Sequence, residues 1–233
     1  MALSRLDIEE EPVEGEDEPP AKTQAEASLE KPLSLNEQRL LSVVAALRSG
    51  GAKRVIDLGC GEGKLIRELL KDRQFEEIVG MDVSVRTLEV AARHLKLERL
   101  PDHQANRLKL IHGSLMYRDE RLEGFDAASV VEVVERLDPP RLNAFERVLF
   151  EFAKPRTVVL TTPNRDYNAT WETLPAGQFR HADHRFEWTR QEFREWAIGI
   201  CARFGYAVRF LPVGPEHSEH GSPTQMGIFE RPG

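Results

Sequence analysis

The stretch from Val55 to Leu65 constrains the fold more than any other part of the chain. It reads VIDLGCGEGKL, an apolar run that ends in Asp57 and is followed by Gly59, Gly61 and Gly63. Glycine tolerates positive φ and, having no Cβ, lets a ligand approach the backbone closely. The pattern predicts a buried strand that turns tightly into a helix around a ligand-binding loop. The spacing differs from the dinucleotide-binding G-x-G-x-x-G, and it does not complete the phosphate-binding G-x-x-x-x-G-K-[ST].

Short β-branched runs alternate with helix-like segments over much of the chain, which predicts parallel strands joined by helical crossovers. The five expected strands are Arg54–Leu58, Ile78–Met81, Leu108–Ile111, Ala127–Val131 and Val158–Thr161. A leading helix of about 15 residues should begin after Ser34, and Thr189 should cap a later helix. Tyr206–Leu211 and Gln225–Phe229 are the last strand candidates, the final one in an antiparallel hairpin. We therefore expect an α/β fold with a mostly parallel seven-stranded sheet and helices on both faces.

The acidic balance of the chain is concentrated near its N-terminal end. The formal net charge is −7, but residues 1–30 hold ten acids and two bases, which leaves +1 for the remaining 203 residues. Because this segment also contains few large apolar groups, we expect residues 1–30 to be a disordered acidic tail or linker and residues 31–233 to be the folded domain. A nucleic-acid partner needs Lys and Arg for its phosphates, so the whole-chain charge alone does not exclude one.

Cysteine content and hydropathy narrow the cellular context. The two cysteines, Cys60 and Cys201, give no disulfide framework. No segment reads as a secretion signal or as the roughly 20 apolar residues of a membrane span. We therefore expect a cytoplasmic protein without a membrane partner, in which Cys60 is a small buried loop residue and not a nucleophile.

A second acidic residue, Asp82, ends the predicted strand IVGM. In nucleotide-binding sheets a carboxylate at this place accepts the ribose hydroxyls; the plainer alternative is a cap for the helix that starts near Ser84. Ser114, after the third strand, should flank an adenine. With an acid two residues before the first glycine, the G-x-G-x-G loop resembles the S-adenosylmethionine loop of class I methyltransferases. The resemblance implies a cofactor site made of Asp57, Gly59, Gly61, Gly63, Asp82 and Ser114.

Two glutamates and a histidine follow the fourth and fifth strands. Glu132 and Glu135 would share one face if this segment forms a helical turn, at the sheet edge where α/β proteins bind ligands. His184 lies in a polar insertion, FRHADHRFEWTRQEF. A mixed carboxylate–imidazole site suits Mn²⁺ or Mg²⁺. The alternative is a pair of solvated acids, with Glu132 bound to Arg136.

The segments DLGCGEG, GSLMYRDERL, VVEVVERLD, TTPNRDYN and DHRFEWTR together closely resemble the RNA 3′-terminal ribose 2′-O-methyltransferase family, over about residues 32–231. The resemblance implies a class I fold, S-adenosylmethionine as methyl donor, an RNA 3′ end as substrate and a Mn²⁺ or Mg²⁺ ion at its terminal diol. It also implies catalytic and metal-ligand roles for Glu132, Glu135 and His184. An RNA-repair kinase–phosphatase or ligase is the partner that it implies, and no DNA partner is expected.

One position departs from the family pattern E-x-x-E-H, because Arg136 stands where the histidine is expected. Arginine has no lone pair to offer a metal. Either water or His181 completes a weakened metal site, or Arg136 neutralises the acids and the metal is lost. A catalytically weakened or inactive module that binds RNA ends or the cofactor is therefore an alternative, as is a small-molecule methyltransferase on the same scaffold.

RNA contacts are expected from the half of the chain that follows the fourth strand. Residues 141–210 hold eleven bases against eight acids. Arginines and aromatic side chains around the insertion would bind phosphate and stack on a terminal base: the candidates are Arg165, Arg180, Arg185, Arg190, Phe179, Phe186 and Trp188. The alternative, which we favour for Trp188, is that the aromatic residues belong to the core.

Overall fold

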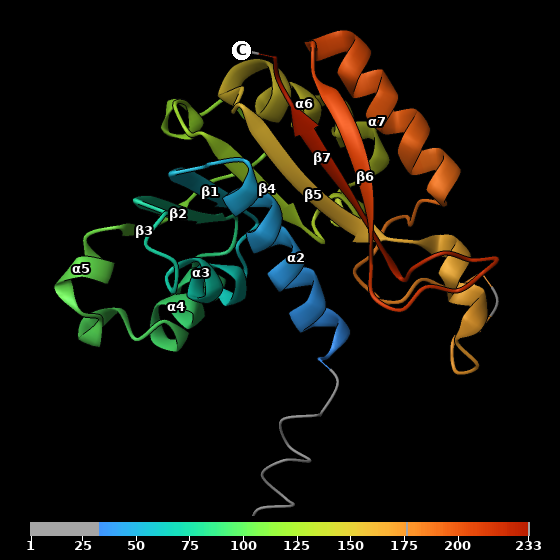
Figure 1. The fold of residues 1–233 in the computed structure, drawn as a ribbon, viewed down its shortest axis with the longest axis horizontal. Coiled ribbons are helices and arrows are strands. Elements are labelled where there is room, and N and C mark those ends of the chain that lie inside the picture. Colours follow the sequence, from blue (N-terminus) through green and yellow to red (C-terminus); the bar gives the residue numbers. More distant parts are fainter. Residues whose placement is uncertain (1–32, 176, 233) are drawn as a thin grey trace, which may run out of the picture. The chain divides into compact units, whose positions relative to one another are not determined.

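A seven-stranded sheet forms the centre of the fold in the computed structural model, which describes residues 33–175 and 177–232 (Figure 1). The predicted acidic tail, residues 1–30, lies outside the described residues. The strands are β1 (Arg54–Leu58), β2 (Glu77–Asp82), β3 (Leu108–His112), β4 (Ala127–Val131), β5 (Thr157–Pro163), β6 (Ala207–Val213) and β7 (Thr224–Glu230). Each overlaps a strand expected from the sequence.

The strand order is β3-β2-β1-β4-β5-β7-β6. The first five strands are parallel to one another, and β7 runs antiparallel to both of its neighbours, β5 and β6. The last strand of the chain is therefore inserted between two strands that precede it. Because the carboxyl ends of β1, β2, β4 and β5 share one edge, the loops that leave these strands meet there.

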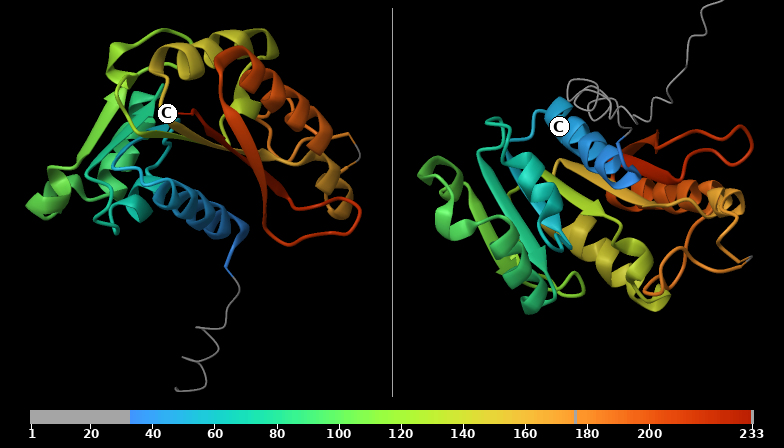
Figure 2. Two further views of the ribbon diagram at one scale, coloured as in Figure 1. Left: turned by 45° about the horizontal axis from the view of Figure 1, so that its top comes forward. Right: turned by 90° about the horizontal axis from the view of Figure 1, so that it is seen from below.

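Helices cover both faces of the sheet, as expected. They are α2 (Leu35–Ser49), α3 (Lys64–Leu69), α4 (Val85–His94), α5 (Asp102–Ala105), α6 (Leu142–Glu146), which continues into a π-helical segment over Arg147–Ala153, and α7 (Arg190–Phe204). Figure 2 shows α2 and α6 on opposite sides of the sheet. Among the described residues, none of these helices is long and apolar enough to cross a membrane.

Alternating side chains of the strands divide the core into two clusters, one on each face. Ile56 and Val158 belong to the cluster that packs against α7, whereas Val55 and Val159 belong to the cluster that packs against α2. Strands buried on both faces are typical of a parallel sheet between helical layers. Cys60 is buried in the second cluster, as predicted, and burial raises the pKa of its thiol.

The two longest helices begin at the predicted caps. The Ser34 side chain accepts the backbone N–H of Glu37, while the Glu37 carboxylate accepts the backbone N–H of Ser34. Thr189 and Glu192 make the same reciprocal pair at the start of α7. Such a capping box satisfies two backbone donors that a helix start otherwise leaves without partners. It fixes where α2 and α7 begin, and α2 lines the candidate site through Asn36, Arg39 and Leu40.

Candidate active site

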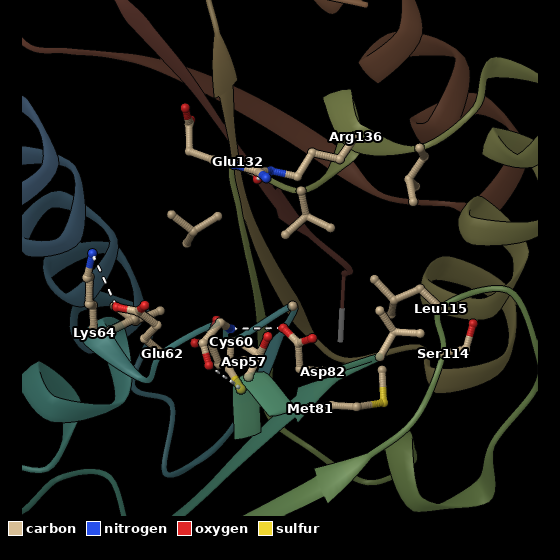
Figure 3. Close-up of a pocket in the computed structure, with 18 of the residues that line it drawn as sticks. Asp57, Cys60, Glu62, Lys64, Met81, Asp82, Ser114, Leu115, Glu132 and Arg136 are labelled. Carbon is tan, nitrogen blue, oxygen red and sulfur yellow. Dashed lines mark hydrogen bonds and ion pairs between the residues drawn. The ribbon is translucent and has the colours of Figure 1, made fainter. Parts of the chain in front are cut away.

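A cavity of about 870 Å³ opens at the edge where the parallel strands end. It is lined by the loops after β1, β2, β3 and β4 and by one side of α2. Five of the six predicted cofactor residues line it, together with one predicted metal ligand: Asp57, Gly59, Gly61, Asp82, Ser114 and Glu132. Figure 3 shows Asp57 and Asp82 close together on one side of this cavity, with Glu132 and Arg136 on the other.

The third glycine of the loop has a different position. Gly63 is the N-cap of α3, with φ +76°, and does not line the cavity. A Cβ at this residue would lie 2.9 Å from the Leu95 side chain and 3.4 Å from that of Ala91. Gly63 therefore lets α3 start close to α4. Its predicted contact with a cofactor has no support in this geometry.

The two acidic residues of the cofactor side are held by different partners. Asp57 is buried and accepts a hydrogen bond from Ser129 Oγ at 2.9 Å, yet burial raises the pKa of its carboxyl to about 7. Asp82 accepts the backbone N–H of Gly61 at 3.0 Å and that of Ser84 at 2.9 Å. The cap of α4 is the Ser84 side chain. Asp82 thus ties the glycine loop to the start of α4 while it faces the cavity.

The cofactor loop touches the turn that carries the two glutamates. Gly59 has φ +77°, and a Cβ built there would lie 2.6 Å from Val133 Cγ2. Val133 stands between Glu132 and Glu135. The loop and the turn can therefore pack this closely only because residue 59 is glycine.

Glu132 adopts a left-handed backbone conformation, with φ +56°. The helical turn covers only Val134–Arg136, so the expectation that both glutamates lie on one helical turn is wrong. The backbone N–H of Glu132 donates to the Thr161 carbonyl oxygen at 3.1 Å, and the Glu132 carboxylate accepts from Thr161 Oγ1 at 3.1 Å. The same carboxylate lies 3.3 Å from Arg39 Nε of α2. Burial raises the pKa of Glu132, and the charge of Arg39 opposes this shift.

Glu135 is fully buried and only half satisfied. Its Oε2 accepts a hydrogen bond from Thr162 Oγ1 at 3.2 Å, whereas Oε1 has no hydrogen-bond partner. This oxygen lies 3.9 Å from His184 Nε2, and the other ring nitrogen, Nδ1, lies 2.6 Å from Glu187 Oε1. Burial raises the pKa of Glu135 well above its usual value, and the negative charge of Glu132 adds to the effect.

Arg136 is directed away from both carboxylates. Its Nε donates to the backbone oxygen of Glu132 at 3.2 Å, and one terminal nitrogen lies 3.3 Å from the Asp183 carboxylate. The side chain is 43% exposed, and the cationic partner of Glu132 is Arg39. The alternative in which Glu132 forms an ion pair with Arg136 is therefore wrong. Arg39, which the sequence reasoning missed, carries no local motif; only the packing of α2 against the sheet brings it to the site.

The donors present fit a divalent cation in part. Among the described residues, no group of three His, Cys, Asp or Glu side chains has the arrangement of a metal site. Two donors nevertheless face each other, the unpartnered oxygen of Glu135 and Nε2 of His184, and oxygen and imidazole ligands suit Mn²⁺. His181 is exposed, and its ring centre lies 5.6 Å from that of His184.

The side chains predicted to contact RNA are mostly occupied. Arg165, Arg185 and Arg190 each pair with a carboxylate, and the partly buried Arg180 donates to the Asn164 carbonyl oxygen at 2.6 Å. Phe186 and Trp188 pack against the core. For Trp188 this is the role that we favoured from the sequence. Around the insertion, Phe179 is 37% exposed and Trp171 is 38% exposed, with the Arg180 guanidinium over the Trp171 ring. Trp171 was not among the candidates, because no motif marks it.

The fold and the cavity define a class I methyltransferase domain. The family model described as a methyltransferase domain matches residues 31–208, so the chain belongs to that family. A crystal structure of the methyltransferase domain of the bacterial protein CtHen1 is 54% identical, with a TM-score of 0.79, over 84% of this chain and 100% of that one. The chain is therefore a member of the Hen1, or small RNA 2′-O-methyltransferase, family.

Curated relatives of this family are longer than the matched region. The small RNA 2′-O-methyltransferase of Mus musculus is 37% identical over 193 residues, which make up 78% of this chain and 47% of that protein. The protein of the same name from Arabidopsis thaliana is 32% identical over 91% of this chain and 24% of its own length. The chain thus spans about half, or less, of these relatives. The fold and family support S-adenosylmethionine as the cofactor.

Proposed function

We propose that this chain transfers a methyl group from S-adenosylmethionine to the 2′-hydroxyl of the 3′-terminal ribose of RNA. The observation that carries the proposal is the direct contact of the cofactor loop with the glutamate turn at Gly59 and Val133. Methyl transfer needs the donor methyl and the accepting oxygen in line and in contact. A donor held by the loop and a hydroxyl held at Glu132 and Glu135 would meet this requirement. The names of the relatives, small RNA 2′-O-methyltransferase, support the same substrate.

The residues of the chain would divide the work as follows. Asp82 would accept the ribose hydroxyls of the cofactor, Ser114 would lie beside the adenine, and the loop at Gly59 and Gly61 would let the cofactor approach the backbone. Asp57, which is buried beneath the loop, would support the loop from below. The cavity lining supports these roles, since all five residues face one space.

A Mn²⁺ or Mg²⁺ ion would be held by Glu135 and His184, with Glu132 as a third ligand. When bound, such an ion lowers the pKa of a coordinated hydroxyl and orients it. The chain itself keeps the donors dry and aimed: Thr162 holds one oxygen of Glu135 and leaves the other free. Without a bound ion, Arg39 balances the negative charge of Glu132.

The RNA end would be bound mainly through its last nucleotides. Most arginines near the site already have carboxylate partners, so few are available for phosphates, and we expect a shallow salt dependence. The exposed ring of Trp171 lies 5.2 Å from the carbon of the Arg180 guanidinium, a side chain whose charge acts on Glu132. A base stacked on Trp171 would therefore lie near the reaction centre. A repair kinase–phosphatase or ligase partner and a cytoplasmic location stay predictions.

A labelling assay tests the proposal. A short RNA is incubated with labelled S-adenosylmethionine, with and without Mn²⁺, beside the same RNA ending in 2′-deoxyribose. We expect label only on the RNA with a terminal 2′-hydroxyl, and more of it with Mn²⁺. Equal labelling of both RNAs would overturn the terminal-ribose proposal.

Arg136→His separates an active enzyme from a degraded site. If cofactor binds without turnover and Arg136→His restores turnover, the chain is a weakened binding module. We expect turnover before the substitution, because Arg136 is directed onto Asp183 and leaves Glu135 free.

A further inference from the structure

A third glutamate, Glu187, stands behind His184. It is 1% exposed, and its Oε1 lies 2.6 Å from His184 Nδ1. We propose that Glu187 is a positioning residue that fixes the His184 ring, with Nδ1–H bound and the Nε2 lone pair directed at Glu135. The inference deepens the proposed function and rests on it for its catalytic meaning. It concerns the orientation of one ring, which can be measured without any turnover.

The other two hydrogen-bond partners of Glu187 are both donors, which favours a proton on the His184 nitrogen that faces it. Its Oε1 accepts the backbone N–H of Arg180 at 2.8 Å, and its Oε2 accepts from Asn168 Nδ2 at 2.6 Å. With these partners the side chain is a carboxylate that can only accept, so Nδ1 of His184 must carry the hydrogen. A neutral imidazole has a single N–H. In the neutral ring, the lone pair is then at Nε2.

The opposite end of the ring faces the buried Glu135. Nε2 lies 3.9 Å from Glu135 Oε1, too far for a hydrogen bond, and this oxygen has no other partner. Two electron-rich atoms facing each other in a dry site form a receptor for a divalent cation. A flipped ring would present C–H to that place and the other tautomer would present N–H, so in either case the receptor would be lost. Partners that orient a ligating histidine in this way typically contribute about 10- to 100-fold in metal affinity.

The test uses two substitutions in one hydrogen-bonded cluster. Glu187→Ala removes the acceptor of Nδ1–H. Asn168→Ala is the matched control, since it removes the partner of Glu187 Oε2 and an acceptor of Arg180 but leaves the contact with His184. Glu187→Gln keeps the size of the side chain, so it serves if the alanine variant does not fold.

Two readouts are needed, ring ¹⁵N shifts of His184 by NMR and Mn²⁺ affinity by titration calorimetry. In the unmodified chain we expect one tautomer, with the proton on Nδ1. Glu187→Ala should give a mixture of tautomers and about 10- to 100-fold weaker Mn²⁺ binding, with a smaller loss for Glu187→Gln, while Asn168→Ala stays within about threefold. Unchanged ¹⁵N shifts and unchanged Mn²⁺ affinity in both Glu187 variants would overturn the inference.

The methylation assay separates this inference from the proposed function. If RNA is not methylated but the tautomer of His184 depends on Glu187, the proposed function fails and the positioning role stands. If RNA is methylated and the tautomer is indifferent to Glu187, the positioning role fails alone.

Discussion

The cofactor loop and the glutamate turn lie in contact, yet their carboxylates are held in opposite ways. Asp82 has two backbone donors and Asp57 has the Ser129 hydroxyl. Glu135, by contrast, is fully buried with one oxygen unpartnered. Buried polar groups are nearly always hydrogen-bonded, so an exception of this kind calls for a reason.

The contrast teaches that only one of the two regions is complete without its ligand. The loop is satisfied by backbone groups of the same motif, and a bound cofactor adds to what is there. The turn keeps a buried charge and a left-handed Glu132, and both features cost stability. Under the proposed function, a cation or a hydroxyl bound at Glu135 would offset part of that cost.

Among the substitutions that test this difference between the two regions, Glu135→Gln should have the largest effect on methyl transfer. We expect methyl transfer to fall by about 100-fold or more, because the variant loses a preorganised charge at the reaction centre. The free energy of unfolding should stay the same or rise, since a buried carboxylate with a raised pKa is removed. Labelled transfer and urea denaturation measure the two effects. Glu151→Gln, at an exposed i,i+4 pair with Arg147, is the control; full activity in Glu135→Gln would contradict the assigned role.

Gly59→Ala should damage both regions at once. An alanine at residue 59 would have to adopt φ +77°, and its methyl group would collide with the Val133 side chain. We expect a loss of about 1–3 kcal/mol in the free energy of unfolding, from strain and overpacking. Cofactor affinity should fall about 10-fold or more, because the loop is displaced. Calorimetry with S-adenosylmethionine measures the affinity.

Gly51→Ala is the control for Gly59→Ala. Gly51 has φ +69° but no atom within 4 Å of an added Cβ, so it carries the conformational cost without the collision. Equal effects of the two substitutions would refute the contact between loop and turn.

The pH dependence of the free energy of unfolding should show the raised pKa of Asp57. Its folded pKa, about 7, is above the ordinary value of 3.8, so the protonated form is favoured in the native state. The stabilisation is complete below about pH 4 and is lost as the pH rises through 7. Between pH 6 and pH 8 this group should lower the free energy of unfolding by about 1.4 kcal/mol. Asp57→Asn should lose that part of the slope in urea titrations; an unchanged slope would show that Asp57 titrates normally.

Arg136→Ala should have the smallest effect. Its head is 43% exposed and pairs with an exposed carboxylate, so we expect the free energy of unfolding to change by less than about 0.5 kcal/mol. Arg39→Ala is the comparison, because the Arg39 side chain is 12% exposed and faces Glu132, whose side chain is 17% exposed. Thermal melts of both variants give the ranking. A larger loss for Arg136→Ala would mean that Arg136, and not Arg39, balances the two glutamates.

The strands and the cofactor loop were predictable from sequence because their signals are local. The run before Asp57 and the glycines after it lie within eleven residues, and β1 and β4 have the predicted bounds. The Ser34 and Thr189 caps rest on residues three positions apart. Short-range patterns of this kind report on backbone preference directly.

The glutamate turn was predictable only in outline. Resemblance named Glu132, Glu135 and His184, but the left-handed Glu132 depends on the Thr161 carbonyl in the neighbouring strand. The partnership of Arg39 with Glu132 spans 93 residues and arises from helix packing. Neither leaves a mark in the local sequence. The motif did not indicate that Gly63 also packs α3 closely against Leu95, which only the structure shows.

The position of β7 has a consequence for synthesis on the ribosome. This strand pairs with β5 over Thr157–Pro163, the segment whose threonines hold the two glutamates, yet it follows every other strand in the chain. Until β7 has been synthesised, the β5 edge of the nascent sheet is unpaired and can pair with a wrong strand. The segment that holds the two glutamates therefore gains its neighbour β7 last, and a chain released before residue 224 would have the cofactor loop but not this pairing.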